Sequence, residues 1–225
     1  MTRLTNLIAA GAMTAAVAIA APASAQVAGI ATASPELAIA RSAARATGYQ
    51  QISTTYSAQL TQATTLRQEI NTLQQSLDTN KDNQLSEAEV QANPNVVQQI
   101  QQKEQQVQQI AQPITIAQTY VLDQLAREWD AARQQVVSAK KINLLLSPDA
   151  IQWGPPSVDV TSDIVAALDQ RKPTVTTAVP AGWQPTQQIL QLHQAIQRIL
   201  LAAAQQQQAQ AQQPNQPQQP APTGR

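Results

Sequence analysis

One glycine, Gly48, stands between Ala40 and Ala139, and apolar residues recur in that stretch at every third or fourth position. This spacing places apolar side chains on one face of an α-helix. The pattern forms two long runs, separated by a short polar segment between Asp78 and Asn95. Each apolar stripe is so narrow that only a partner helix can bury it. The sequence therefore predicts a long antiparallel helical hairpin whose tip lies in the polar segment.

The two runs have spacings close to those of a coiled coil. The first contains Tyr49, Ile52, Tyr56, Leu60, Ala63, Leu66, Ile70, Leu73 and Leu77. The second contains Val97, Ile100, Val107, Ile110, Ile114, Ala117, Val121, Leu125, Trp129, Ala132 and Val136. An arm of roughly 40 residues reaches ~60 Å at a helical rise of about 1.5 Å per residue. Such a length is typical of an arm that holds a partner or of a spacer. Pro113 is expected to kink the second arm.

The N-terminal residues have the three parts of a secretory signal peptide. Arg3 is followed by an apolar stretch from Leu7 to Ala21 and by the small residues Ala23-Ser24-Ala25. The apolar stretch is Ala-rich and too short for a stable membrane span. We expect residues 1–25 to be removed, which leaves an exported, soluble chain that does not span a membrane.

The composition limits the functions open to this chain. It has 14 basic and 14 acidic residues, and loss of Arg3 with the signal peptide leaves one more acid than base. No electrostatic argument for nucleic-acid binding remains. The chain has no cysteine, which excludes thiol catalysis and disulfides. The chain has no phenylalanine and few other aromatic residues, so it has few large apolar side chains with which to form one large core. We therefore expect it to oligomerise.

The fold class expected is α+β, mostly α, with a small β-body beside the helical arms. Residues 26–34 supply the first strand, and Ser34 and Pro35 begin the hairpin, which occupies residues 35–140. Residues 141–180 are expected to add two strands, Lys141–Leu146 and Ala150–Trp153, and a short helix capped by Thr161. Trp153 fits the strand alternation and is expected to pack.

The C-terminal part divides in two. Residues 181–204 contain a predicted amphipathic helix with Ile189, Leu192, Ile196 and Ile199 on one face, which we expect to dock on the body or on a partner. Residues 205–225 are rich in Gln and Pro and are expected to be disordered.

The order of these parts resembles the Skp/OmpH family of periplasmic chaperones for outer-membrane proteins. The strongest local similarity runs from Lys141-Ile142-Asn143-Leu144-Leu145-Leu146 through Ala150-Ile151-Gln152-Trp153 to Val158-Asp159-Val160-Thr161 and the helix after it. The resemblance covers about residues 27–171 and does not reach the C-terminal helix or tail.

The resemblance implies a periplasmic homotrimer in which strands of three chains join in a central β-body and helical arms surround a cavity. Unfolded outer-membrane proteins would be held there without ATP. The best-known members are strongly basic, whereas this chain is close to neutral. Attraction to acidic clients or to lipopolysaccharide is therefore not carried over.

The predicted tip contains the pattern of a twelve-residue EF-hand loop, residues 78–89. The candidate calcium ligands are Asp78, Asn80, Asp82, the backbone carbonyl of Gln84, Ser86 and Glu89. Asn83 stands where glycine is usual, and asparagine tolerates the left-handed conformation needed there. The same polar residues also suit a hairpin tip without a metal, so both interpretations stay open. No cofactor is required by either one.

The candidate client-binding residues on the arms are Tyr49, Tyr56, Leu66 and Trp129, which equally fit the seam between the helices. No catalytic residue is predicted, because His193, the single histidine, has no acid or nucleophile at helical spacing. The sequence therefore predicts a non-enzymatic holdase. A calcium-binding spacer or scaffold of the cell envelope is an alternative, as is a coiled-coil adaptor that uses the Gln/Pro tail.

Overall fold

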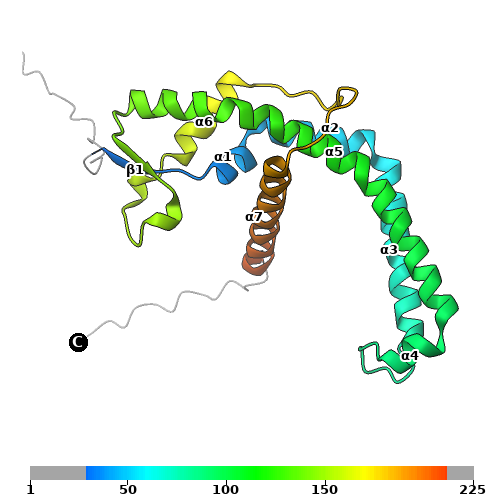
Figure 1. Ribbon diagram of the computed structural model, residues 1–225. Coiled ribbons are helices and arrows are strands. Elements are labelled where there is room, and N and C mark those ends of the chain that lie inside the picture. The colour runs from blue at the N-terminus through cyan, green and yellow to red at the C-terminus, as the bar shows by residue number, and fades with distance from the viewer. Residues whose placement is uncertain (1–28, 212–225) are drawn as a thin grey trace, which may run out of the picture.

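Long helices make up most of this chain, as the computed structural model in Figure 1 shows. The structure describes residues 29–211. The predicted signal peptide and the tail from residue 212 onward lie outside the described residues. The prediction of a mostly helical chain with few strands is confirmed.

The β-body consists of two short parallel strands, β1 (Ile30–Thr32) and β2 (Leu144–Leu146). Ile30 is paired with Leu144 and Thr32 with Leu146, so the N-terminal segment meets the segment that follows the helical arms. An isolated bridge joins Thr32 to Asp159.

The second strand expected in this region, Ala150–Trp153, is not formed. Short 3-10 turns, η1 (Pro148–Ala150) and η2 (Pro156–Val158), lie on either side of it instead. The prolines at 148, 155 and 156 have no N–H to give to a strand ladder, which explains why the chain turns here.

The first half of the arm is built from three consecutive helices, α1 (Pro35–Arg41), α2 (Ala43–Thr55) and α3 (Ser57–Leu77). The Ser34 hydroxyl caps α1, as predicted, by accepting the N–H of Leu37 at 3.1 Å. Ser42 separates α1 from α2, and its buried hydroxyl donates to Asp169 at 2.7 Å. The helical period therefore continues across two breaks that the apolar pattern does not reveal.

The returning half is one helix, α5 (Pro94–Ala139), which follows the short tip helix α4 (Glu87–Ala92). Gly48 lies against Val121, and farther out Glu69 is paired with Lys103, so the two halves run antiparallel. Pro113 stands inside α5, which changes direction along its length and remains one helix (Figure 1).

The apolar seam is largely buried along this arm. Its fully or nearly fully buried members are Ile52, Ala63, Leu66, Ile70, Leu77, Ile100, Ile114, Ala117, Val121, Leu125, Ala132 and Val136. Two separate clusters result. The main core joins β1, α1, α2, α5, α6 and α7, whereas Ile70, Leu77 and Ile100 form a small cluster near the tip.

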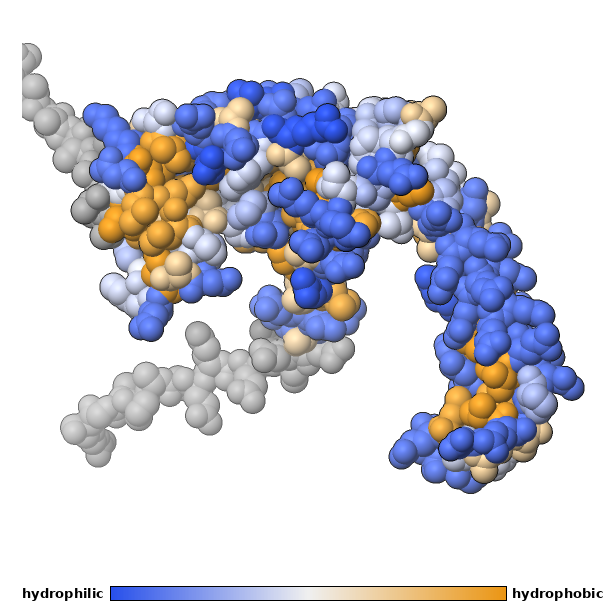
Figure 2. Space-filling view, viewed as in Figure 1, coloured by the Kyte–Doolittle hydropathy of each residue, from blue (hydrophilic) through white to orange (hydrophobic). Residues whose placement is uncertain are grey.

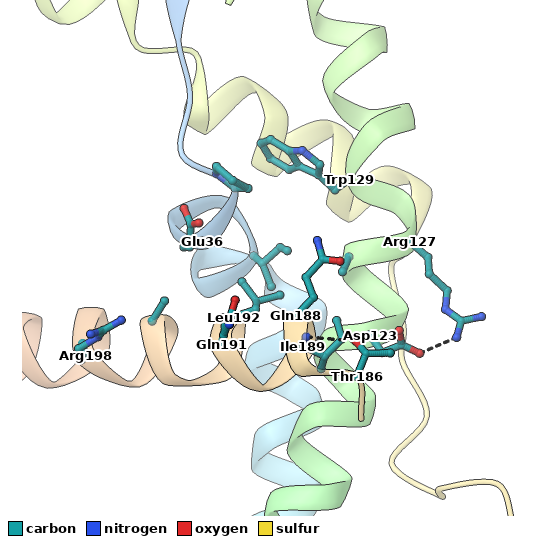
Figure 3. A pocket seen from close by; sticks show the side chains of 14 residues that line it. Glu36, Asp123, Arg127, Trp129, Thr186, Gln188, Ile189, Gln191, Leu192 and Arg198 are labelled. Carbon is teal, nitrogen blue, oxygen red and sulfur yellow. Dashed lines mark hydrogen bonds and ion pairs between the residues drawn. The ribbon is translucent and has the colours of Figure 1, made fainter. Parts of the chain in front are cut away.

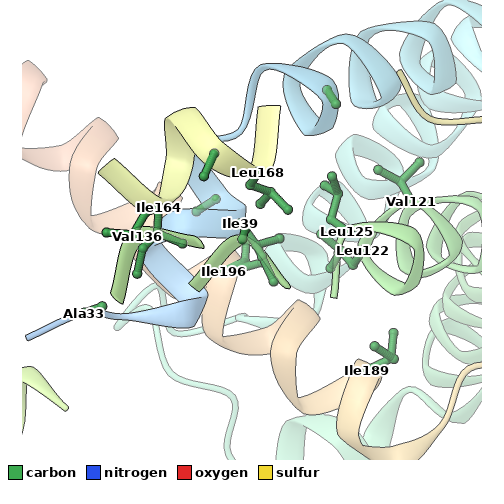
Figure 4. Close-up of a cluster of buried hydrophobic side chains, with 14 of the residues drawn as sticks. Ala33, Ile39, Val121, Leu122, Leu125, Val136, Ile164, Leu168, Ile189 and Ile196 are labelled. Atoms are coloured by element: carbon green, nitrogen blue, oxygen red, sulfur yellow. The ribbon is translucent and has the colours of Figure 1, made fainter. Parts of the chain in front are cut away.

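Helix α6 (Thr161–Arg171) packs on α1 and α5, and its Ile164 and Leu168 are fully buried (Figure 4). Its cap differs from the prediction. The Asp159 carboxylate accepts the N–H of Thr161 at 2.8 Å, while the Thr161 hydroxyl accepts the N–H of Ser34 at 3.2 Å. Thr161 therefore ties α6 to the start of α1 and does not cap its own helix.

Helix α7 (Gln187–Ala211) docks on α1 and α5. The amphipathic helix was expected to dock on the body or on a partner, and it is observed to dock on the arm helices of its own chain. The helix is longer than predicted, because residues 205–211, assigned from sequence to the disordered tail, are helical. Alanine and glutamine both have good helix propensity, which explains the continuation.

Candidate functional site

The four candidate client-binding residues do not form one surface. Leu66 is buried in the seam between α3 and α5. Tyr49, Tyr56 and Trp129 are half-buried and pack against the main core, so each offers only part of its ring to solvent. Leu66 therefore contributes to holding the arm together, and the three aromatic residues lie near its junction with the body.

Tyr49 is the most constrained of the four. The Arg45 guanidinium lies 5.0 Å from the centre of its ring. Burial raises the pKa of the Tyr49 hydroxyl to about 12, although the nearby Arg45 opposes the shift. Within the described residues this hydroxyl is buried without a hydrogen-bond partner. The ring is thus a packing element with an unsatisfied polar end.

An open groove of about 720 Å³ lies between α1, α5 and α7 (Figure 3). Its apolar lining includes Ile39, Ala126, Trp129, Leu192 and Ala195. Charged side chains stand around these residues: Glu36, Asp123, Arg127 and Arg198. Because Arg127 is paired with Asp123 at 2.7 Å, part of this charge is already neutralised.

A second exposed apolar area lies on the β-body, where Figure 2 shows hydrophobic residues gathered at the end of the molecule opposite the arm tip. Ile30 is 36% exposed, Leu144 48% and Trp153 85%. The expectation that Trp153 packs is therefore wrong for the single chain, because the strand that would have turned it inward is absent. This part of the β-body offers an apolar surface beside β2, while Asp159 and Val160 lie along the other side of β1.

The tip loop holds its predicted calcium ligands in a network of hydrogen bonds. The Asp78 carboxylate accepts the N–H groups of Asp82 at 3.1 Å and Asn83 at 2.9 Å. The Asp82 carboxylate accepts the N–H of Gln84 at 2.7 Å and the side-chain amide of Asn80 at 3.0 Å. Asn83 has φ of 62°, the left-handed conformation expected for it.

Glu89 is engaged more fully than any other residue of this loop. One carboxylate oxygen accepts from the N–H and hydroxyl of Thr79 and from the N–H of Asn80. The other accepts from the N–H and hydroxyl of Ser86, whose oxygen in turn caps α4. These bonds, led by those from Ser86, lower the pKa of Glu89 to about 2. Glu89 therefore joins the two ends of the loop through hydrogen bonds.

The carboxylates of the loop do not converge in this arrangement. Within residues 29–211, no group of three or more His, Cys, Asp or Glu side chains is placed to hold a metal ion. Asp78 and Asp82 bond to the backbone in the first half of the loop, whereas Glu89 bonds across its base. Calcium binding stays a prediction, and it requires Glu89 to change its partners.

The OmpH family model, described as Outer membrane protein (OmpH-like), matches residues 29–168, which is more than half of the chain. The chain belongs to the OmpH-like family. The resemblance derived from the strand, arm and helix order is thereby confirmed. At the level of the family, this membership supports a chaperone role, and the family is periplasmic in general and is not a family of enzymes.

A solved structure of a candidate outer membrane chaperone (OmpH-like) from Caulobacter crescentus CB15 is also similar. It is 24% identical to this chain, and the match covers 66% of this chain and 88% of that one with a TM-score of 0.41. A likeness of that strength carries no argument about function. No curated protein matches the chain significantly.

The OmpH-like match ends before the segment that sequence reasoning described least well, residues 172–186, which lies along α5. The side-chain amide of Gln124 donates to the carbonyl of Thr176 at 2.8 Å and accepts its N–H at 3.1 Å. The Trp183 indole N–H donates to Asp123 at 3.3 Å, and its ring meets Tyr120 edge-on at 5.0 Å. The sequence pattern assigned no role to Trp183, so this anchor was not predicted.

None of the helices in the described part of this OmpH-like chain combines the length and hydrophobicity needed to cross a membrane.

Proposed function

We propose that this OmpH-like protein is a periplasmic, ATP-independent holdase that binds unfolded outer-membrane β-barrel proteins. The observation that carries the proposal is the long arm of α3 and α5, which leaves the body and carries partly buried apolar side chains around its tip cluster, Leu73, Val96, Val97 and Val107. Beside its base lies an open groove and not an enclosed pocket. Such surfaces offer many weak apolar contacts, which suits a chaperone that must release its client.

We propose further that the working form is a homotrimer. Within the described residues the sheet has two short strands, and a two-stranded sheet is marginal by itself in water. The exposed Ile30, Leu144 and Trp153 would be covered by strands from other copies, which would extend the sheet at β2 because Asp159 and Val160 already lie along β1. This arrangement supports a shared β-body with three arms around a space for the client.

The holdase proposal is tested by dilution of a urea-unfolded outer-membrane barrel protein into the purified mature chain. Light scattering then reports whether the client stays soluble, and a matched sample with albumin in place of the chaperone controls for nonspecific protection. We expect suppressed aggregation without added ATP. Aggregation at the rate of the albumin control would reject the proposal for this class of client.

We also propose that the tip loop, residues 78–89, binds calcium, as a spacer or scaffold of the envelope would. The support is the ligand register in the sequence, together with the left-handed Lys81 and Asn83 that let Asp78 turn back onto the loop. Because Glu89 must give up its hydrogen bonds, we expect weak binding, on the order of 10⁻⁴ to 10⁻³ M, as in other exported modules.

Calorimetric titration with calcium tests this second proposal. Glu89→Gln should abolish the binding, while Glu87→Gln, an exposed neighbour on α4, should leave it intact. A holdase that works through its arms keeps its activity in Glu89→Gln, whereas a spacer that works through calcium loses it. Equal calcium affinity in the wild type and both variants would contradict binding at this loop.

A further inference from the structure

Helix α7 covers a surface of the region that matches the OmpH-like family, residues 29–168. The OmpH-like match ends at residue 168, and α7 begins at Gln187. On α7, Ile196 is fully buried and Ile189 nearly so, within the same core as Ile39 of α1 and Leu122 of α5. Leu192, Ile199 and Leu200 pack partly against it. An added helix therefore shields apolar side chains of α1 and α5.

The contacts that hold α7 are mostly apolar. Among the described residues, no ion pair links α7 to the rest of the chain. Its side-chain contact with α5 is neutral, between His193 Nε2 and Gln118 Oε1 at 3.2 Å. From Leu201 to Ala211 the helix is exposed all round. About half of α7 thus makes the docking contact, and that half could be replaced by another apolar segment.

The surface under α7 is continuous with the open groove. Ile39 and Trp129, which line the groove, also belong to or pack against the main core, and Leu192 of α7 forms the opposite wall (Figure 3). An incoming chain segment can therefore contact the apolar surface of the groove first. As α7 moves away, the segment can then contact the apolar surface that α7 had covered. In the view of Figure 1, α7 and the outer part of the arm project to the same side of the body.

Residues 172–186 would keep a detached α7 close by. Gln124 holds Thr176 through two hydrogen bonds, and Asp123 and Tyr120 hold Trp183. These anchors do not involve α7 itself, so they can persist when it leaves. A tethered segment rebinds at a high effective concentration, which favours release of a weakly bound competitor.

We propose that the face of α1 and α5 beneath α7 is a client-docking surface, occupied by α7 in the free protein and by an apolar, uncharged segment of an unfolded outer-membrane protein in the complex. The proposal rests on the holdase function proposed above. In this exchange α7 is a built-in competitor. A client segment with aliphatic side chains is suited to the surface because the surface presents aliphatic residues and one aromatic ring.

The first test compares two truncations of the full chain. One ends after Pro185 and lacks α7, and the matched control ends after Ala211 and lacks only the tail. If α7 is undocked in about one molecule in ten, loss of α7 tightens client binding about tenfold. Affinity is measured with a fluorescently labelled, urea-unfolded barrel protein. Unchanged or weaker binding without α7 would overturn the proposal.

The second test keeps α7 in place, so that it does not depend on how the truncated chain folds. Glu36 of α1 and Gln191 of α7 both line the groove (Figure 3), and the chain has no cysteine of its own. In the Glu36→Cys/Gln191→Cys variant a flexible bismaleimide can join the two helices. We expect the joined form to bind client at least about tenfold more weakly than the same variant left unjoined, because the fraction with α7 undocked falls toward zero.

The outcomes of these tests distinguish the exchange of α7 from the holdase function itself. Equal client binding by joined and unjoined forms rejects the exchange of α7 and leaves the holdase function standing. Failure of every variant, wild type included, to bind client rejects the holdase function and the docking surface with it.

Discussion

The ring of Tyr49 packs against the main core, but its buried hydroxyl lowers the stability of the fold. It is buried without a hydrogen-bond partner, and burial raises its pKa to about 12. Tyr49→Phe removes the unsatisfied group and keeps the ring, so we expect the free energy of unfolding to rise by about 1 kcal/mol. Urea unfolding followed by circular dichroism measures the change. Tyr56→Phe is the control and should be neutral, and a clear loss of stability in Tyr49→Phe would show that the hydroxyl has a partner.

Glu89 is the residue on which the tip depends. Its pKa is about 2 in the folded chain against an ordinary 4.5, so its contribution to tip stability is complete above pH 4.5 and is lost as the pH falls toward 2. Glu89→Gln should raise amide hydrogen exchange at Thr79, Asn80 and Ser86 at neutral pH. Glu87→Gln should not do so, and equal exchange in the two variants would refute the role of Glu89.

At the residue scale, the sequence predicted the role of a residue where that role depends on the residue's own backbone conformation or on its position in the helical period. The seam members Ile52 and Ile114, the Ser34 cap and the left-handed Asn83 could all be predicted. Trp153 could not, because its exposure depends on a neighbouring strand that does not form. The hydrogen bonds of Glu89 were also not predicted. The EF-hand pattern indicates which residues could bind calcium, but it does not indicate which N–H and hydroxyl groups would bond to their carboxylates instead.

Among the helices, the contact of α2 with α5 depends on Gly48. A Cβ there would lie 2.8 Å from Val175 Cγ2 and 3.2 Å from Val121 Cγ2. Gly48→Ala should therefore destabilise the chain by about 1 to 2 kcal/mol, because crowding outweighs the gain in helix propensity. Thermal unfolding measures it, and addition of Val175→Ala should recover part of the loss. Stabilisation by Gly48→Ala alone would mean that the side chains of Val175 and Val121 move aside at little cost.

Helix α7 should dock less firmly in mild acid. His193 is half-buried between α7 and α5, where Gln118 and Gln197 face it, and burial lowers its pKa below the ordinary 6.5. The undocked imidazole takes up a proton more readily, so docking is at full strength above about pH 6.5 and weakens as the pH falls below it. Hydrogen exchange of α7 at pH 7.5 and 5.5 should show this difference. His193→Gln should remove it, and persistence in that variant would assign the effect to another group.

At the element scale, long helices were predictable because a 3.6-residue period repeats many times in α3 and α5. The breaks at Ser42 and Tyr56 were not, since Ser42 precedes the first apolar run and makes a contact with Asp169, and Tyr56 fits the period of that run. The β-body was predicted with one strand too many. Three-residue strands carry too little periodicity to be told from the proline-rich turns around them.

At the scale of the molecule, residues 29–211 bury most of their apolar side chains between helices, and they leave the groove beside α7 and the edge of the β-body open. In the function proposed above, other copies would cover the open edge, and clients would contact the arms and the groove. Neither area is enclosed or centred on a reactive side chain, which agrees with membership of a chaperone family.

Size-exclusion chromatography with light scattering on the mature chain, mixed with a urea-unfolded outer-membrane barrel protein, tests the central claim most directly. The account predicts a soluble complex with the mass of three subunits and one client. A trimer that elutes alone while the client precipitates as it does without chaperone would contradict it.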